Sequence, residues 1–309
     1  MALLDIDDLR VHFPTAAGLV RAVDGVSLTV QEGGSLCLTG ESGSGKTVVA
    51  LAIVGLLPTG AMVGGQIRFD GRDLMTMPRH ELRRLRGRAI GMIFEQPWNA
   101  LNPTMRVGEQ IAEAVRIAAP GSRRDARSRA LDLMAMVDIP ARASRYRQYP
   151  HEFSGGMQQR VMIAIALAGR PRLLIADEPT TALDVTVQAQ IVDLLREVTE
   201  ETGASLLLVT HDLDVGASLC EELAVMYAGE IIESGRLQKV EATPRHPYTQ
   251  MLLHAVADDG LHPIPGTVPE LSDLPSGCRF HPRCPAVMDR CAAEHPVFDA
   301  DVRCWLWSR

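Results

Sequence analysis

Three short apolar runs divide the chain, and each predicts a strand that is buried on both faces. They are residues 35–39, 173–178 and 205–209. Continuous runs of this kind, rather than alternating polar and apolar residues, are typical of parallel strands covered by helices. A helical stretch over residues 48–54 follows soon after the first run. The pattern therefore predicts an α/β fold built around a parallel sheet.

The remaining segments predict smaller parts around that sheet. Residues 3–39 are rich in β-forming positions, residues 61–95 hold a turn-rich stretch, a short helix and a strand, and residues 97–160 are mostly helical. Helices and strands alternate again over residues 161–235. Within this part, residues 225–234 contain Gly229 and have the composition of a hairpin.

A glycine-rich loop joins the first apolar run to its helix. Residues 40–47 read Gly-Glu-Ser-Gly-Ser-Gly-Lys-Thr and fit the pattern G-x-x-x-x-G-K-[ST]. Glycines let the backbone turn its N–H groups toward phosphate oxygens, and the following helix adds the positive end of its dipole. Lys46 can reach the β- and γ-phosphates, and the Thr47 hydroxyl can bind Mg²⁺. The strand before and the helix after favour a nucleoside triphosphate site over a glycine-rich surface turn.

Two carboxylates, Asp177 and Glu178, end the second apolar run. Parallel α/β sheets bind ligands at the carboxyl ends of their strands, so we expect Asp177 to lie beside the phosphate loop and to help hold Mg²⁺. Glu178 can polarise a water molecule for attack on the γ-phosphate. The alternative is a strand that merely ends in two solvated acids, which the phosphate loop makes less favourable.

Three further motifs resemble those of ATP-binding cassette (ABC) proteins. Residues 153–160, Phe-Ser-Gly-Gly-Met-Gln-Gln-Arg, look like the signature motif of that family and precede Asp177 at the family's spacing. Residues 181–184 resemble its D-loop, and His211 resembles its switch histidine. The resemblance covers residues 3–250. It implies a RecA-like core, an antiparallel β-subdomain and a helical subdomain over residues 97–160.

The resemblance also implies a role for each matching residue. Glu178 would be the general base, and His211 would contact the γ-phosphate. Two cassettes of this family pack head to tail, so that the signature of one closes on the ATP held by the other. The residues implied in binding ATP and Mg²⁺ are Gly40, Glu41, Ser42, Gly43, Ser44, Gly45, Lys46, Thr47, Asp177, Ser154, Gly155, Gly156, Met157 and Asp184.

The chain departs from the family pattern at two places. Residues 92–97, Met-Ile-Phe-Glu-Gln-Pro, resemble the Q-loop, but Glu95 stands where its glutamine is expected and Gln96 follows. Either Glu95 binds Mg²⁺ through a carboxylate oxygen, or the loop shifts to present Gln96. Met157 replaces the usual glutamine of the signature. Phe13 is the candidate for stacking on adenine, and a phenylalanine of the core is the alternative.

Composition limits the class of protein. The chain has 309 residues, of which 46% are hydrophobic and 22% charged, with a formal net charge of −7. This balance is ordinary for a globular protein and argues against a general affinity for nucleic acids. The longest apolar runs are shorter than the ~20 residues of a membrane span. Residues 1–8 lack a signal-peptide pattern. We therefore expect an intracellular protein that reaches the cytoplasmic face of the membrane through its partners.

A motif in the last third of the chain indicates which ABC proteins it resembles most. Residues 245–249, Arg-His-Pro-Tyr-Thr, resemble the hallmark of dipeptide and oligopeptide importer ATPases, which nickel and opine importers share. A proline-rich connector at residues 264–269 then leads to a cysteine-rich end. We predict two domains: residues 1–255 as the nucleotide-binding domain, and residues 256–309 as a C-terminal extension.

Four of the six cysteines lie in this extension: Cys278, Cys284, Cys291 and Cys304. Clustered thiols in an intracellular protein favour a metal over disulfides, because the cytosol is reducing. Four thiolates suit either tetrahedral Zn²⁺ or a [4Fe–4S] cluster, but the spacing lacks the close pairs of most zinc sites. The peptide-importer ATPases that the chain resembles can carry an iron–sulfur cluster here, so [4Fe–4S] is favoured and zinc is the alternative.

The resemblance implies an ATPase subunit that hydrolyses ATP to drive peptide import. Its partners would be a second ABC ATPase subunit in a heterodimer, two membrane-spanning permease subunits and, indirectly, an extracytoplasmic solute-binding protein. One alternative is the same role in a nickel or opine importer. The other is a soluble ABC ATPase that acts on DNA or ribosomes, but that class usually has two fused cassettes or coiled-coil arms, and this chain has neither.

Overall fold

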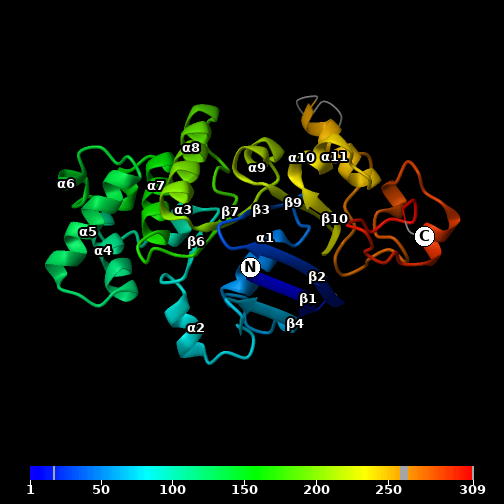
Figure 1. Ribbon diagram of the computed structural model, residues 1–309, viewed down its shortest axis with the longest axis horizontal. Coiled ribbons are helices and arrows are strands. Elements are labelled where there is room, and N and C mark those ends of the chain that lie inside the picture. Colours follow the sequence, from blue (N-terminus) through cyan, green and yellow to red (C-terminus); the bar gives the residue numbers. More distant parts are fainter. Residues whose placement is uncertain (17, 258–263, 308–309) are drawn as a thin grey trace. The chain divides into compact units, whose positions relative to one another are not determined.

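The computed structural model describes residues 1–16, 18–257 and 264–307 (Figure 1). The chain folds into two compact units. The first comprises Met1–Val30, Ser35–Thr76 and Val209–Arg309, and the second comprises Gln31–Gly34 and Met77–Leu208. No helix in the described part of the chain is both long and apolar enough to cross a membrane.

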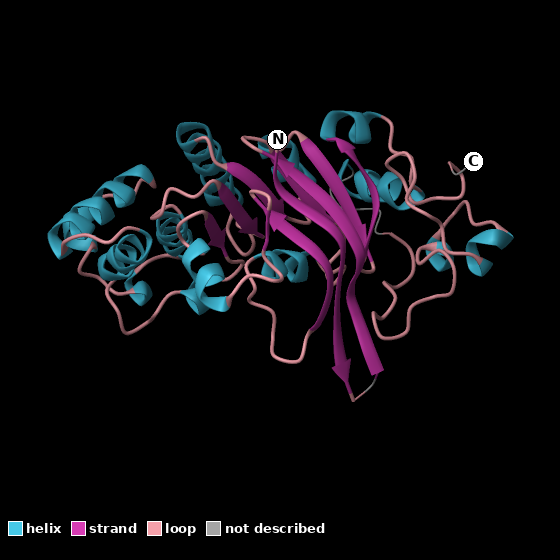
Figure 2. Cartoon of the chain, turned by 60° about the horizontal axis from the view of Figure 1, so that its bottom comes forward, coloured by secondary structure: helices cyan, strands magenta, loops and turns pink. Residues whose placement is uncertain are grey.

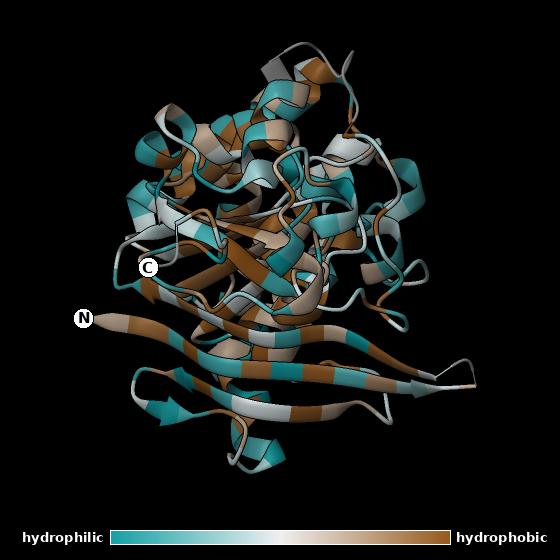
Figure 3. Ribbon diagram, turned by 90° about the vertical axis from the view of Figure 1, so that its right-hand side faces the viewer, coloured by the Kyte–Doolittle hydropathy of each residue, from teal (hydrophilic) through white to brown (hydrophobic). Residues whose placement is uncertain are grey.

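A four-stranded sheet, in the order β2-β1-β4-β5, lies in the first unit. All strands are drawn in magenta in Figure 2. Strand β1 pairs antiparallel with β4, and β4 pairs antiparallel with β5. Apolar and polar residues alternate along these strands (Figure 3), so that one face is buried. This confirms the expected β-subdomain. The strands are β1 (Ala2–Thr15), β2 (Gly18–Gln31), β4 (Met62–Phe69) and β5 (Arg72–Asp73).

Strand β4 corrects one expectation, because its residues were predicted to be turn-rich. Gly64 and Gly65 weaken its pattern, yet the strand is continuous. Its register with β1 shifts between Asp7 and Arg10. A Cβ on Gly65 would lie 2.2 Å from the carbonyl oxygen of Asp8, so only glycine permits this close approach of the two strands.

The first unit also contains strands in the order β10-β9-β3. Strand β3 runs parallel to β9, and β9 forms an antiparallel hairpin with β10 through Ala228 and Gly229, as the sequence predicts. The strands are β3 (Ser35–Thr39), β9 (Glu222–Tyr227) and β10 (Glu230–Arg236). The helices of this unit are α1 (Lys46–Ile53), α9 (Leu213–Leu219), α10 (Leu237–Ala242), α11 (Pro247–Ala257), η2 (His281–Arg283) and α12 (Asp289–Ala293).

The second unit combines a parallel sheet with helices. Its strands follow the order β8-β7-β6, and β6 pairs parallel with β7. They are β6 (Ile90–Ile93), β7 (Leu173–Asp177) and β8 (Ser205–Val209), and β7 is buried along its whole length. The helices are α2 (Arg79–Leu85), α3 (Pro97–Ala100), α4 (Val107–Ala118), α5 (Arg123–Met136), α6 (Arg142–Arg145), η1 (Pro150–Glu152), α7 (Gly155–Ala166) and α8 (Val185–Thr202).

The C-terminal segment, residues 264–307, consists mostly of loops and is drawn in orange and red in Figure 1. Its largest buried side chain is Phe280, which packs against the rings of Tyr227, His246 and Tyr248. This segment therefore shares the core of the first unit. The predicted domain boundary at residues 255–256 falls in α11, and residues 258–263 lie outside the described residues.

Candidate functional site

The phosphate loop runs from the end of β3 to the start of α1. Gly40 has a φ of 146° and Gly45 a φ of 106°, which glycine adopts readily and other residues do not. A Cβ on Gly40 would lie 2.0 Å from the carbonyl oxygen of Met226, and one on Gly45 would lie 2.1 Å from that of Ala22. The two glycines thus let the loop pack against the main chain of β9 and β2.

Lys46 turns back onto this loop from the first turn of α1. Its Nζ donates hydrogen bonds to the carbonyl oxygens of Gly40 at 2.7 Å and Glu41 at 3.0 Å. The hydroxyl of Ser44 is buried, and no hydrogen-bond partner for it exists among the described residues. Buried hydroxyls without a partner are rare in folded proteins, and a phosphate oxygen would supply the missing acceptor. The Thr47 side chain is exposed at the same helix end.

His211 lies just after the end of β8 and is exposed. The preceding Thr210 donates its N–H to the carbonyl oxygen of Leu38 at 3.2 Å, which ties this segment to β3. The following Asp212 caps α9 by accepting from two backbone N–H groups. His211 is therefore held at both sides, next to the strand that leads into the phosphate loop. Phe13, the candidate for adenine, is half-buried in β1.

The two acidic residues occupy the carboxyl end of β7 in the second unit. Asp177 is the last residue of the strand and is only 2% exposed. Glu178 has a φ of 47°, a left-handed conformation that is uncommon for a non-glycine residue and that concentrates at functional sites. The hydroxyl of Thr181 donates to its Oε2 at 3.1 Å. The carboxylate of Glu178 is thus fixed by a residue of the same turn.

The signature and D-loop residues meet where α7 and α8 begin. Ser154 and Gly155 are exposed at the start of α7, and Met157 is half-buried. A Cβ on Gly156 would lie 2.4 Å from Cγ1 of Val187, so this glycine lets α7 approach α8. Asp184 caps α8 by accepting from the N–H of Val187 at 3.0 Å. The structure brings these two motifs together within the second unit.

The Q-loop residues follow β6 in the same unit. The side-chain oxygen of Gln96 accepts a hydrogen bond from the side-chain amide of Asn99 at 2.6 Å, within the first turn of α3. Glu95 is half-buried and precedes this turn. The side-chain oxygen of Gln96 is therefore already used in a hydrogen bond within its own turn.

The four C-terminal cysteines share one neighbourhood. Burial raises the pKa of the Cys278 thiol to about 12, and repulsion from the thiols of Cys291, Cys304 and Cys284 contributes to the rise. None of the six cysteines, which all lie in the described part of the chain, forms a disulfide. Across residues 1–16, 18–257 and 264–307, no group of three or more His, Cys, Asp or Glu side chains is arranged to hold a metal ion. The four thiols in this segment are nevertheless the donor set of a thiolate-binding metal site.

Sequence reasoning missed the residues that join the C-terminal segment to the phosphate loop. Arg283 donates to both carboxylate oxygens of Glu41, at 2.7 and 3.0 Å. The hydroxyl of Tyr248 accepts the N–H of Glu41 at 2.8 Å. Arg279 donates to the carbonyl oxygen of Ala228 at 2.6 Å. The motif at residues 245–249 and the cysteine spacing marked these segments, but no local pattern indicates that they contact residue 41.

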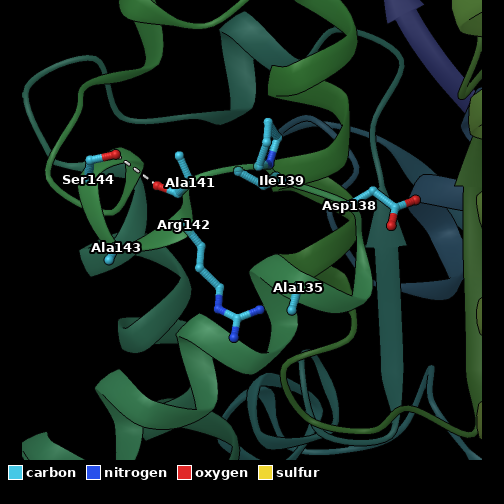
Figure 4. Close-up of a pocket in the computed structure, with 8 residues that line it drawn as sticks. Ala135, Asp138, Ile139, Ala141, Arg142, Ala143 and Ser144 are labelled. Atoms are coloured by element: carbon cyan, nitrogen blue, oxygen red, sulfur yellow. Dashed lines mark hydrogen bonds between the residues drawn. The ribbon is translucent and has the colours of Figure 1, made fainter.

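A pocket of about 790 Å³ lies in the helical part of the second unit, where α5 ends and α6 begins (Figure 4). Two of its lining residues are joined by a hydrogen bond, which the Ser144 hydroxyl donates to the carbonyl oxygen of Ala141 at 2.8 Å. None of the residues predicted to bind nucleotide or metal lines this pocket. Its lining residues are Ala135, Asp138, Ile139, Pro140, Ala141, Arg142, Ala143 and Ser144.

Comparisons with known proteins agree with the motifs. The ABC transporter family matches residues 23–181, and the oligopeptide/dipeptide transporter C-terminal region matches residues 232–291. The dipeptide transport ATP-binding protein DppD of Escherichia coli is 47% identical over 305 residues, which cover 97% of this chain and 93% of that protein. The oligopeptide transport ATP-binding protein OppD of the same organism is 46% identical, over 96% of this chain and 89% of that protein.

Solved structures show the same relationship. The dimeric ATP-binding cassette MJ0796, in a post-hydrolysis state bound to ADP and Pi, aligns with a TM-score of 0.68 and 30% identity, covering 76% of this chain and 98% of that chain. The sequence identity and the shared fold lead to one conclusion: the chain belongs to the ABC transporter family, as an ABC ATPase with the C-terminal region of the oligopeptide/dipeptide transporters.

Proposed function

We propose that this chain is the ATPase subunit of a peptide importer and that it hydrolyses ATP to drive peptides through membrane subunits. The observation that carries the proposal is the likeness to DppD over 97% of the chain, which includes both the ATPase motifs and the C-terminal region. The proposed position is peripheral, at the cytoplasmic face of the membrane. The proposed partners are a second ATPase subunit in a heterodimer, two permease subunits and a solute-binding protein.

The phosphate loop would bind the triphosphate. Lys46 donates two hydrogen bonds to carbonyl oxygens of its own loop. A phosphate oxygen is a stronger acceptor for an ammonium group, so bound ATP would replace these bonds with better ones. Ser44 would gain the partner that it lacks. When bound, Mg²⁺ would neutralise charge on the β- and γ-phosphates, and we propose Thr47 and Asp177 as its protein ligands.

Hydrolysis would use Glu178 as the general base and His211 as the contact to the γ-phosphate. The hydrogen bond from Thr181 supports the first role, because a base must be held within reach of its water. We propose that Glu95 takes the role of the missing Q-loop glutamine. The side-chain oxygen of Gln96 is engaged by Asn99, and Glu95 precedes the helical turn that holds them.

The signature residues would act on the nucleotide of the second ATPase subunit. Ser154 and Gly155 are exposed at the N-terminal end of α7, a helix of 12 residues without an acidic residue in its first turn. Such a helix end attracts phosphate oxygens. Gly156, Met157 and Asp184 would support this surface from α7 and the start of α8.

For the C-terminal segment we propose a [4Fe–4S] cluster on Cys278, Cys284, Cys291 and Cys304, with zinc as the alternative. The support is chemical: burial, together with the neighbouring cysteines, raises the pKa of the Cys278, Cys284 and Cys304 thiols, and a bound cation would favour their thiolate forms. When bound, the cluster would supply a structural link between loops. Anaerobic purification should give about four iron and four sulfide per chain. One zinc per chain would favour the alternative. The absence of both iron and zinc would contradict both assignments. Cys291→Ser should lose the metal, and the matched core variant Cys220→Ser should keep it.

The transport role is tested with the complete importer in lipid vesicles. We expect ATP hydrolysis to rise when a binding protein loaded with dipeptide is added, and labelled dipeptide to accumulate inside. Uptake of nickel without any response to peptides would favour the nickel-importer alternative. A chain that hydrolyses ATP without any membrane partner and responds to DNA or ribosomes would contradict the proposal.

A further inference from the structure

The loop between the first two C-terminal cysteines, residues 278–284, reaches the phosphate loop through Arg283. The side chain of Arg283 is only 4% exposed. Besides the two bonds to Glu41, it donates to the hydroxyl of Tyr227 at 3.3 Å and to the carbonyl oxygens of Ile264 at 3.2 Å and Pro265 at 2.9 Å. All five N–H donors of a guanidinium are thus used. A planar group that is fully satisfied in this way holds one orientation.

Glu41, the second residue of the phosphate loop, is fixed at three points. Arg283 holds its carboxylate, and Tyr248 accepts its backbone N–H. Lys46 donates to its carbonyl oxygen. The first two contacts come from outside the loop. Glu41 is therefore the point at which the C-terminal part of the chain acts on the phosphate loop.

Arg279 supports the same loop from a second side. It donates to the carbonyl oxygen of Ala228 in the β9–β10 turn, and the next N–H, of Gly229, donates to the carbonyl oxygen of Ser44 at 2.9 Å. Arg279 also pairs with Asp24 and with Glu230. Arg283 thus contacts Glu41 directly. Arg279 is linked to Ser44 through Ala228 and Gly229.

We propose that Arg283 is a positioning residue of the ATPase site: it holds Glu41 so that the phosphate loop keeps the conformation that receives the triphosphate. The proposal rests on the role of residues 40–47 as the phosphate loop. It assigns the C-terminal segment a part in ATP binding, although that segment follows the ATPase motifs in the sequence.

The physical reason is preorganisation. A loop with three glycines at positive φ has many alternative conformations, and ATP must select one of them. The ion pair of Arg283 with Glu41, here called the clamp, removes that freedom before the ligand arrives. The clamp therefore strengthens ATP binding. Because the clamp holds the loop equally before and during the reaction, it should affect KM and not kcat.

The test measures the ATP dissociation constant, KM and kcat of the purified full-length chain or its complex. Arg283→Gln and Glu41→Gln should each raise the dissociation constant and KM about tenfold, with kcat changed less than about twofold. The double variant should be no worse than either single variant, because both remove the same ion pair. Arg283→Lys keeps the charge but loses the two-pronged geometry and should fall between wild type and Arg283→Gln.

Matched controls separate this effect from others. Arg290→Gln removes an exposed arginine of the same segment, whose ion pair with Glu294 is solvent-exposed, and should leave KM unchanged. Unaltered KM in both Glu41→Gln and Arg283→Gln, or additive effects in the double variant, would overturn the proposal. If Arg283→Gln does not fold, Glu41→Gln decides. Lys46→Ala tests the phosphate loop itself. If this variant binds ATP as wild type does, residues 40–47 are not the phosphate loop, and the proposed role of Arg283 loses its basis.

Discussion

The backbone N–H of Glu41 donates a hydrogen bond of 2.8 Å to the hydroxyl of Tyr248, which lies 207 positions further along the chain. Tyr248 is fully buried and packs against Tyr227 and Phe280. The tyrosine of the motif at residues 245–249 therefore contacts the phosphate loop directly. This relationship gives a physical role to a motif that the sequence presents only as a family hallmark.

Tyr248→Phe should weaken ATP binding. The substitution keeps the aromatic packing but leaves the N–H of Glu41 without its acceptor, which should cost about 1 kcal/mol. Isothermal calorimetry with ATP would measure the change in affinity. Tyr146→Phe is the matched control, because it removes a buried hydroxyl that donates to Glu109 in the second unit. An equal loss of ATP affinity in both variants would contradict the specific role of Tyr248.

Glu95→Ala should lower ATP hydrolysis by about tenfold or more, whereas Gln96→Ala should have a small effect. The reason is the hydrogen bond between Gln96 and Asn99, which occupies the side-chain oxygen of the glutamine. Steady-state ATPase assays of the assembled importer would measure both rates. If Gln96→Ala is the more damaging substitution and Glu95→Ala is not, the loop shifts to present Gln96.

Stability should fall as the pH is lowered, partly because of His246. Burial lowers its pKa to about 3, and its Nδ1 accepts the N–H of Tyr248 at 3.0 Å. The unfolded chain takes up this proton near pH 6.5, but the folded chain does not until about pH 3. The contribution of the neutral ring is therefore complete above about pH 6.5. It declines below that value by up to about 1.4 kcal/mol per pH unit.

His246→Asn tests this pH dependence, because asparagine offers an acceptor but does not titrate in this range. The free energy of unfolding should be measured in urea between pH 7 and pH 4. We expect the wild-type value to fall more steeply than that of the variant, so that the difference between them narrows with acid. Parallel curves would show that His246 is not protonated on unfolding.

Local patterns were enough to predict the elements that carry the ATPase motifs. The buried run that ends at Asp177 is the strand β7, and the loop that ends in Lys46 begins a helix. Strand β4 was missed because Gly65 weakens the alternation while serving a close approach between strands. The contact of Arg283 with Glu41 could not be predicted, since it joins residues 242 positions apart and depends on the packing of Phe280.

The proposed role of Glu178 as the general base of ATP hydrolysis is tested most directly by Glu178→Gln. ATP binding and turnover should be measured on the same preparation of the assembled importer. We predict that the variant binds ATP with a dissociation constant within about twofold of wild type and hydrolyses it at least about 100-fold more slowly, since the amide cannot accept a proton. Glu201→Gln, an exposed glutamate of α8, should behave as wild type. Turnover by Glu178→Gln at the wild-type rate would contradict the claim.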